Sequence, residues 1–457
     1  MQRKGAWGYT MPPVTMVTMA SLIQAKHPEF QVAVLDAAAT NMSYREALEA
    51  VARNHPDLVV VNTSTPTIDD DLHFIGQLAA KHSGKGPTIA AFGIHVSVLY
   101  EELLRSQSGL NLAILGEPEW TALELAEALD TQQPLANVPG LAWLEGEELV
   151  RSPQRPFLED LDQLPIADWS FVSLDPYRLP FDGQRFLLLN TNRGCPYHCS
   201  FCNAHVFYGR RQRRRSVAHI MDEIRQDVER FGVRNLMFWA EEFVLDKAFV
   251  LALSQAIIDS DLDISWVCNS RVDGVSPEVL EKIHEAGCWN IAYGIESGAQ
   301  SILDRSNKGI SLDVTRKAVT WTKQAGLKVT GHVILGLPGE SRSTMEETHR
   351  FVQSLELDYV QYYCAMPYPG SSFYEQALDA GWVQSHDWHR YEHNDCVVDY
   401  PQLAGKEIRS ARTRYFLAFY FQPTILWKLA RENLDSVSHA WHFARTLVDF
   451  GRWILFR

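Results

Sequence analysis

Three cysteines stand close together in this chain, at positions Cys195, Cys199 and Cys202. Thiolates at this C-x3-C-x2-C spacing on one loop can bind three irons of a 4Fe–4S cluster and leave the fourth iron without a protein ligand. Such a cluster is a reagent rather than an electron store, because the open iron can bind a reactant. A structural zinc site is the competing interpretation, but it normally takes four protein ligands and no second cysteine pair is available. The spacing therefore favours an iron–sulfur cluster.

The length, composition and net charge of the sequence restrict the class of protein. The chain has 457 residues, 46% hydrophobic and 21% charged, which is typical of a globular protein with two or three domains. No apolar run reaches about 18 residues, so we expect no transmembrane helix, and the first residues do not form a secretory signal. A net charge of -14 argues against a nucleic-acid binder. The other cysteines are scattered singly, which favours a reduced, cytoplasmic location.

Strand and helix patterns alternate through residues 1–150. The predicted strands are 32–35, 57–62, 88–92 and 112–115, and the predicted helices are 14–25, 44–54, 69–82, 99–105 and 122–129. Such alternation predicts an α/β fold with a doubly wound parallel sheet, Rossmann-like in type. Ligands bind beyond the carboxyl ends of such strands, here at the polar loops 62–67 and 93–97. We interpret His95 as a hydrogen-bonded loop residue rather than a metal ligand, because no second ligand lies nearby in the sequence.

A different pattern follows. Residues 151–180 are irregular and bracketed by prolines, which predicts a linker. Residues 181–370 give six strand–helix units, which predict a partial (β/α)6 TIM-like barrel with its chemistry at the carboxyl ends of the strands. Its predicted strands are 187–190, 236–239, 265–268, 290–293, 329–335 and 359–363, and its predicted helices are 218–231, 247–260, 277–285, 312–325 and 343–355. Residues 371–457 are predicted to form a helical, aromatic-rich C-terminal region, with helices at 374–380 and 406–421.

The cysteine loop and four later segments together resemble the signature of the radical S-adenosylmethionine (SAM) enzymes. These segments are Phe238–Asp246, Ser270–Asp273, Gly294–Gly298 and Gly331–Glu340, each at a predicted strand end. The resemblance implies that the cysteines hold a 4Fe–4S cluster that cleaves SAM to a 5′-deoxyadenosyl radical. It also implies SAM contacts from Phe201 to adenine, from Glu241 to the amino group, from Arg271 to the carboxylate or near the sulfonium, from Glu296 to ribose, and from the backbone of Gly336 beside adenine.

The N-terminal part resembles the cobalamin-binding domain that is fused to many radical SAM enzymes. Its segments 34–36, 55–57 and 115–119 carry the resemblance, and it implies corrinoid contacts from Asn62, Thr63, Ser64 and Gly93. The apolar strand that normally opens this domain is absent, which indicates a truncated or misplaced start. No DxHxxG segment occurs, so a histidine ligand to cobalt is not expected. Both a corrinoid without a protein axial ligand and a domain without a cofactor stay open.

The whole chain resembles the radical SAM proteins of hopanoid biosynthesis and the anaerobic magnesium-protoporphyrin IX monomethyl ester cyclases. This implies a bulky apolar substrate such as a hopanoid-type lipid or a tetrapyrrole, and C–H functionalisation by cyclisation, rearrangement or cobalamin-dependent methylation. A flavodoxin or ferredoxin is the expected electron donor. A non-catalytic sensor that binds the cluster with SAM or a corrinoid is the alternative of another class. A methylthiotransferase is less favoured, because residues 1–150 contain no cysteines for a second cluster.

Two further stretches lie outside these segments. The arginine-rich run 210–215 is expected at a helix entry or against an anionic substrate rather than on nucleic acid. The aromatic tail is expected to form core packing, a lid over the substrate or a peripheral membrane contact. Its aromatic residues are Tyr415, Phe416, Phe419, Tyr420, Phe421, Trp427, Trp441, Phe443, Trp453 and Phe456.

Overall fold

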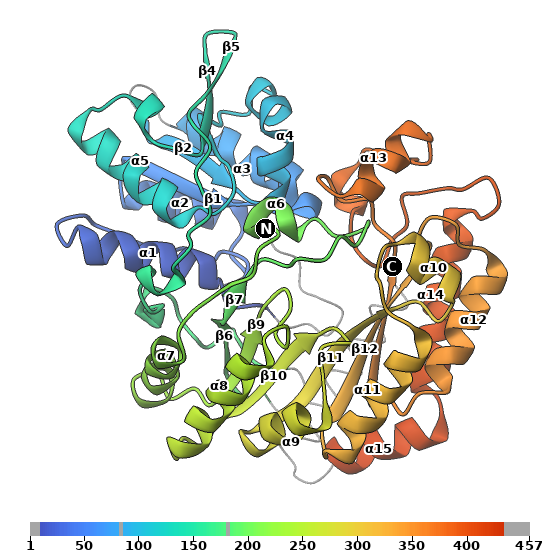
Figure 1. Cartoon of the computed structure of the whole chain (residues 1–457). Helices are drawn as coiled ribbons and strands as arrows, with labels where there is room; N and C mark the ends of the chain where they lie inside the picture. The colour runs from blue at the N-terminus through green and yellow to red at the C-terminus, as the bar shows by residue number, and fades with distance from the viewer. Residues whose placement is uncertain (1–9, 82–85, 180–182, 434–457) are drawn as a thin grey trace.

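The protein contains two main β-sheets, each covered by helices (Figure 1). The structure is a computed structural model, and it describes residues 10–81, 86–179 and 183–433. The N-terminal sheet has five strands and the second sheet has six parallel strands. The predicted α/β class, with a Rossmann-like sheet followed by a TIM-like partial barrel, is confirmed.

The N-terminal sheet has its strands in sequential order. Its parallel part consists of β1 (Leu58–Asn62), β2 (Thr88–Phe92) and β3 (Leu112–Ile114), and the antiparallel hairpin β4 (Leu141–Glu145) and β5 (Glu148–Arg151) extends it. Side chains alternate between the two faces of a strand. Ala90 and Phe92 therefore face one apolar cluster, and Ile89 and Ala91 face the other. Helices α1 (Val14–Lys26) and α5 (Glu119–Thr131) cover the first face, and α2 (Tyr44–Arg53), α3 (Ile68–Lys81) and α4 (Ile94–Arg105) cover the second.

Two expectations for this sheet are wrong. Residues 32–35 form no strand, because among the described residues their backbone groups pair with no strand of the sheet, and Leu35 is exposed. The predicted loop 93–97 is mostly the first turn of α4, which begins at Ile94 rather than near Leu99. Leu99 has non-helical backbone angles inside α4, so the helical pattern in the sequence is interrupted there.

The segment between the two sheets is irregular, as its prolines predict. Its described residues include two short 3-10 turns, η3 (Leu161–Gln163) and η4 (Trp169–Phe171), and an isolated bridge between Arg178 and Arg185. Trp169 and Tyr177 are nonetheless fully buried, and the Tyr177 hydroxyl donates a 2.8 Å hydrogen bond to Asp36. The proposed boundaries at residues 150, 180 and 370 stay predictions.

The second sheet is a partial barrel of six parallel strands in the order β13-β12-β11-β10-β9-β6. Its strands are β6 (Phe186–Asn190), β9 (Asn235–Trp239), β10 (Ser265–Ser270), β11 (Cys288–Glu296), β12 (Lys328–Leu335) and β13 (Tyr359–Cys364). The helices that connect them are α7 (Val217–Glu229), α8 (Lys247–Asp259), α9 (Pro277–Glu285), α10 (Gln300–Arg305), α11 (Leu312–Gln324) and α12 (Arg342–Gln353). Side chains of Ser216, Asp246, Ser276, Ser311 and Ser341 each cap a helix by accepting a backbone N–H, which fixes where that helix begins.

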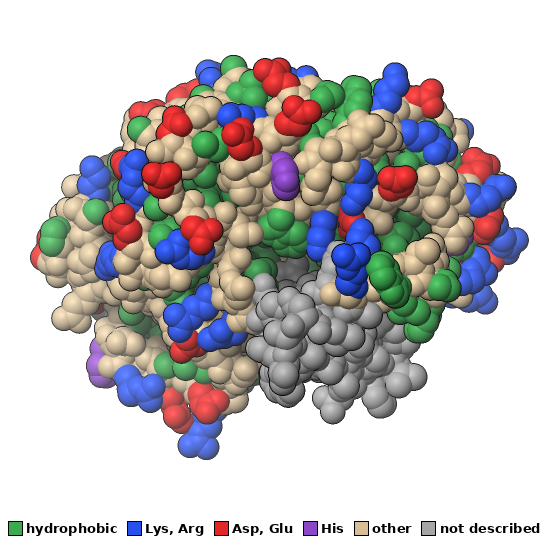
Figure 2. All heavy atoms as spheres, turned by 90° about the horizontal axis from the view of Figure 1, so that it is seen from below, with side chains coloured by type: hydrophobic (Ala, Val, Ile, Leu, Met, Phe, Trp, Pro, Cys, Tyr) green, Lys and Arg blue, Asp and Glu red, His purple; other side chains and the backbone are tan. Residues whose placement is uncertain are grey.

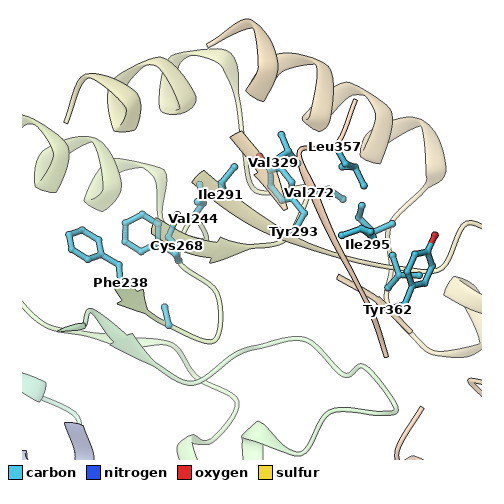
Figure 3. Packing of buried hydrophobic residues seen from close by; sticks show 14 of the residues in the cluster. Phe238, Val244, Cys268, Val272, Ile291, Tyr293, Ile295, Val329, Leu357 and Tyr362 are labelled. Carbon is cyan, nitrogen blue, oxygen red and sulfur yellow. The ribbon is translucent and has the colours of Figure 1, made fainter. Parts of the chain in front are cut away.

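The helix-facing side of this sheet carries the large apolar core (Figure 3). Phe238 stacks on Trp266 with ring centroids 4.3 Å apart. On β10, Trp266 and Cys268 are buried in this core, whereas Val267 and Asn269 lie half-buried on the opposite, concave face. The concave face is therefore the less densely packed side, and it is where a ligand can lie.

The C-terminal region packs against the last strand of the barrel. It contains α13 (Ser372–Asp379), η5 (Trp388–Arg390), α14 (Gly405–Tyr420) and α15 (Pro423–Asn433), which confirms the two predicted helices. Tyr415, Phe416, Phe419 and Tyr420 of α14 are core residues, and the Tyr420 hydroxyl bonds to the backbone of Val360. Among the described residues, no helix is long and apolar enough to cross a membrane. The predicted aromatic residues Trp441, Phe443, Trp453 and Phe456 lie outside the described residues.

Candidate functional site

The cysteine loop begins at the carboxyl end of β6 and ends in the short helix α6 (Ala204–Tyr208). Gly194, just before Cys195, has φ +87°, and a Cβ there would overlap the carbonyl oxygen of Arg211 and lie 2.9 Å from that of Tyr208. Only glycine fits this position. The Cys195 amide then donates to the carbonyl of Gly209 at 3.3 Å, so the start of the loop is held by its own return segment.

The remainder of the loop is bonded to later parts of the chain. The Ser200 amide donates to the carbonyl of Ser306, and the carbonyl of Ser200 accepts from the amide of Phe373. The Asn203 side chain donates to the carbonyl of Pro369 at 3.1 Å. The loop is therefore a fixed part of the barrel edge, although its three cysteines are far in sequence from these partners.

The three thiols are free and half-buried. Burial raises the pKa of Cys195 to about 11 and also raises the pKa of Cys199 and Cys202. Lys308, Glu296 and Arg271 lie within electrostatic range of the Cys199 thiol. In the described part of the chain, the one group of three His, Cys, Asp or Glu ligand atoms within 4.8 Å of one another is Asp69, Asp387 and His389. The three sulfurs are therefore not all within 4.8 Å of one another.

Arg271 follows β10 and lies over the cysteine loop. Its guanidinium is 3.6 Å from the ring centroid of Tyr197, which stands between Cys195 and Cys199. Its Nε and Nη2 atoms donate to Asp273 at 2.9 and 2.8 Å. The third nitrogen, Nη1, is buried and has no hydrogen-bond partner among the described residues. An unpaired buried donor of this kind fits an anionic group of a ligand.

Glu296 lies at a bulge at the end of β11, with φ +61°, an uncommon conformation for a residue other than glycine. The Lys308 ammonium donates to it at 2.6 Å, and both side chains are buried. Burial lowers the pKa of Lys308, but the Glu296 carboxylate outweighs burial, and the pKa is raised overall. Lys308 was missed in the sequence, because a single lysine in a loop carries no pattern.

Two neighbouring glutamates follow β9 and point to different partners. Glu241, the predicted SAM contact, accepts the Gly194 amide at 2.9 Å. Glu242 accepts the Ser270 hydroxyl at 2.8 Å and the Arg271 amide at 2.7 Å. Burial raises the pKa of both carboxyls. The sequence prediction chose Glu241 and assigned no role to Glu242. The structure places Glu241 beside the start of the cysteine loop and Glu242 beside Arg271.

The last two predicted SAM contacts are Phe201 and Gly336. Phe201 is half-buried against the apolar core. Gly336 has φ +90°, and a Cβ there would lie 2.8 Å from Ile408 of α14. Its carbonyl accepts the Tyr400 hydroxyl at 2.6 Å. Packing against the C-terminal region thus explains why a small residue stands at Gly336, and its contact with SAM stays a prediction.

Residues 189–352 match the family model of the radical SAM superfamily. This range contains the cysteine loop, Arg271, the Glu296–Lys308 pair and the turn that begins at Gly336. The chain contains a radical SAM domain. This domain implies a 4Fe–4S cluster and SAM as cofactors, and three free thiols, an unpaired guanidinium nitrogen and a buried carboxylate fit those two groups.

Relatives of this chain extend the similarity beyond this domain. An uncharacterised methyltransferase of Pyrococcus horikoshii is 29% identical over 421 residues, 92% of this chain and 90% of the relative. An anaerobic magnesium-protoporphyrin IX monomethyl ester cyclase of Rubrivivax gelatinosus is 26% identical, covering 96% of this chain and 81% of the relative. The similarity therefore includes the N-terminal sheet.

Solved structures resemble this chain in fold. The methyltransferase TsrM from Kitasatospora setae, solved with tryptophan and a SAM analogue, superimposes with a TM-score of 0.69 at 19% identity, covering 82% of this chain and 75% of TsrM. The cobalamin-dependent enzyme OxsB, solved with aqua-cobalamin and SAM, gives a TM-score of 0.65 at 16% identity, covering 90% of this chain and 59% of OxsB. Both likenesses establish a shared arrangement of domains.

The residues predicted for a corrinoid lie at the carboxyl end of the N-terminal sheet. Asn62 is exposed and Ser64 is half-buried, so both can reach a ligand. Gly93 packs on buried Thr63: a Cβ at Gly93 would overlap the Thr63 carbonyl oxygen and lie 2.9 Å from its hydroxyl. His95 is buried against Trp388, and its Nδ1 lies 3.3 Å from the hydroxyl of Thr65. Burial lowers the pKa of His95 to about 4.

The concave face of the barrel carries a further polar group, which the sequence did not indicate. The Nδ1 atom of His332 lies 3.0 Å from the hydroxyl of Tyr363. The ring of Tyr363 is 4.9 Å from that of His393, and burial lowers the pKa of His393 to about 4. His332 lies within electrostatic range of Glu296 and Lys308, so this group borders the Glu296–Lys308 pair.

Proposed function

We propose that this radical SAM enzyme functionalises a C–H bond of a bulky, largely apolar small molecule, and that it does so by methyl transfer through a corrinoid. The observation that carries the proposal is the convergence of three free thiols, the unpaired Nη1 of Arg271 and the Glu296–Lys308 pair at one end of the barrel. The name of the Pyrococcus horikoshii relative supports methyl transfer over other radical reactions.

Each residue of the site has a proposed role. Cys195, Cys199 and Cys202 hold the cluster, which, when bound, supplies the electron that cleaves SAM to a 5′-deoxyadenosyl radical. Arg271 binds the SAM carboxylate through Nη1, Glu241 accepts the amino group, and Glu296 binds the ribose. Phe201 packs on the adenine, and the backbone of Gly336 lies beside it. Lys308 donates to Glu296 and holds its carboxylate in place, and the Tyr197 ring supports the Arg271 guanidinium beside the loop.

The corrinoid contacts are proposed on the accessible edge of the N-terminal sheet. Asn62 and Ser64 offer amide and hydroxyl groups there, and Thr63 and Gly93 shape the turn behind them. His95 is packed edge-on to Trp388, with ring centroids 4.6 Å apart. We propose a corrinoid held without a protein histidine ligand.

Cyclisation or rearrangement is the second candidate, and the 26% identical cyclase of Rubrivivax gelatinosus favours it. The proposed substrates are a hopanoid-type lipid or a tetrapyrrole, and the proposed electron donor is a flavodoxin or ferredoxin.

We also propose a peripheral membrane contact by Phe421, Leu426 and Trp427, three exposed apolar residues in and before α15. Seen from below, the molecule is hollowed at its centre, with Lys and Arg side chains beside the hollow (Figure 2).

The experiment is anaerobic reconstitution with iron and sulfide, followed by SAM and dithionite, with 5′-deoxyadenosine measured by chromatography. We expect 5′-deoxyadenosine from the native chain and none from Cys199→Ala. Cys364→Ala is the matched control, because Cys364 is buried in the core away from the loop. An intact cluster that yields no 5′-deoxyadenosine would support a non-catalytic sensor. Protein purified from cobalamin-supplied cells should keep a corrinoid absorption spectrum. The absence of that spectrum would favour chemistry without cobalamin.

A further inference from the structure

Two arginines beside the cysteine loop meet two glutamates of the N-terminal domain in a buried group. Arg193 stands two residues before Cys195, and Arg213 follows α6. Glu119 begins α5, and Glu117 lies in the turn just before it. Arg193 donates to Glu119 at 2.5 Å and to Glu117 at 3.2 Å, and Arg213 donates to Glu117 through two nitrogens at 2.9 and 3.0 Å. We call these four residues the interdomain charge group.

The interdomain charge group is sealed from solvent. None of its four side chains exposes more than 7% of its surface. Its charges balance, with two guanidinium groups against two carboxylates. Further hydrogen bonds extend the group: Arg213 donates to the carbonyls of Leu158 and Tyr208, and the Leu158 amide donates to Glu117. The group therefore ties together the N-terminal sheet, the linker and the helix that ends the cysteine loop.

Buried ion pairs contribute little net stability, because desolvation offsets their attraction. What a planar guanidinium paired with a carboxylate does supply is direction, since two parallel hydrogen bonds fix the angle and the distance together. Three consecutive residues at the start of the loop are each held by hydrogen bonds. Arg193 makes such a paired contact with Glu119, whereas the Gly194 and Cys195 amides each donate one bond, to Glu241 and to the Gly209 carbonyl. Of these anchors, the one at Arg193 comes from the other domain.

We propose that the interdomain charge group is a positioning device, through which docking of the N-terminal domain sets the conformation of the cluster-binding loop. Arg193, Glu117, Glu119 and Arg213 are positioning residues, and none is placed to bind the cluster itself. The inference goes beyond the proposed reaction, because it holds whichever C–H bond is attacked and whether or not a corrinoid is bound. It predicts that a change in an N-terminal carboxylate alters the environment of a cysteine in the other domain.

The test compares thiol reactivity in the full-length apo protein. Iodoacetamide labelling of Cys195 reports opening of the loop, and labelling of Cys268, a buried core cysteine, reports global unfolding. In Glu119→Gln and in Arg193→Lys we expect Cys195 to label about tenfold faster, a shift of about 1.4 kcal/mol in local opening, with Cys268 unchanged. After reconstitution, the electron paramagnetic resonance spectrum of the reduced cluster should change in both variants.

The matched control is Glu159→Gln. Glu159 pairs with Arg211 at 2.7 Å and so joins the same linker and the same arginine-rich run, but its side chain is 63% exposed and that of Arg211 77%. We expect this control to leave both labelling rates and the spectrum unchanged. Equal acceleration at Cys195 and Cys268, or acceleration at neither, would overturn the proposal. If Glu119→Gln does not fold, Arg193→Lys decides, because it keeps the charge balance; loss of folding in both would assign the group a scaffolding role and overturn positioning.

Discussion

Replacing Gly194 by alanine tests whether the backbone before the first cysteine determines cluster binding. At φ +87° an L-residue with a Cβ costs about 1–2 kcal/mol more than glycine. The added methyl would also overlap the Arg211 carbonyl, a backbone atom that cannot rotate away, and such overpacking costs about 1–3 kcal/mol. We therefore expect Gly194→Ala to lower the free energy of unfolding by about 2–5 kcal/mol.

Gly232 provides the matched control for this prediction. It also has a positive φ, +66°, but a Cβ there would meet nothing within 4 Å. Gly232→Ala should therefore lose only the backbone contribution of about 1–2 kcal/mol and keep its full iron content. The measurements are urea unfolding of the apo protein, followed by tryptophan fluorescence, and iron per chain after reconstitution. The reasoning is refuted if Gly194→Ala is no less stable than Gly232→Ala and binds as much iron as the native chain.

Three further predictions concern buried charges. Burial raises the pKa of Glu340 from 4.5 to about 7, so between these pH values the folded state holds a proton that the unfolded state releases. The stabilisation from this bound proton is complete below pH 4.5 and lost by about pH 7. Urea titrations should therefore show the native chain losing about 3 kcal/mol of unfolding free energy relative to Glu340→Gln across that window. Lys308→Met leaves Glu296 buried without its cation and should cost about 3–5 kcal/mol in urea unfolding, whereas Arg45→Ala, which breaks an exposed pair, should cost at most about 1 kcal/mol. Arg271→Lys keeps the charge but loses the planar fork, so calorimetry on reconstituted protein should give about tenfold weaker SAM binding; unchanged affinity would contradict the role of Nη1.

The barrel could be predicted closely, because each of its strands carries a local signal at both ends. The predicted strand 265–268 is part of β10, and the predicted helix 277–285 has the observed bounds. Serine or aspartate stands before five of its helices and caps them, so the sequence itself marks where they begin. The N-terminal sheet was less predictable. Residues 32–35 have strand composition, but composition cannot tell whether a neighbouring strand is there to pair with them.

The same difference between local and long-range signals separates the site residues that could be predicted from those that could not. Cys195, Cys199 and Cys202 could be found because their spacing is local, and Glu296 because its segment is a motif. Lys308 could not be found, since its role depends on meeting Glu296 across a turn and a helix. Nor could the contact of Gly336 with Ile408, which joins residues far apart in the sequence.

The arginine-rich run shows how such long-range partners change an interpretation. In the sequence it is a dense cationic stretch, expected at a helix entry or against an anionic substrate. In the structure Arg213 is neutralised by Glu117 of the other domain, and Arg215 pairs with buried Glu223 and bonds to the carbonyl of Asn190. Arg214 pairs with Asp246. Three of the cations therefore form ion pairs within the protein that hold the segment around the cysteine loop. Neutralising Glu117 should therefore leave a buried cation beside that loop without its carboxylate, and the loss of structure should appear first as reduced cluster binding.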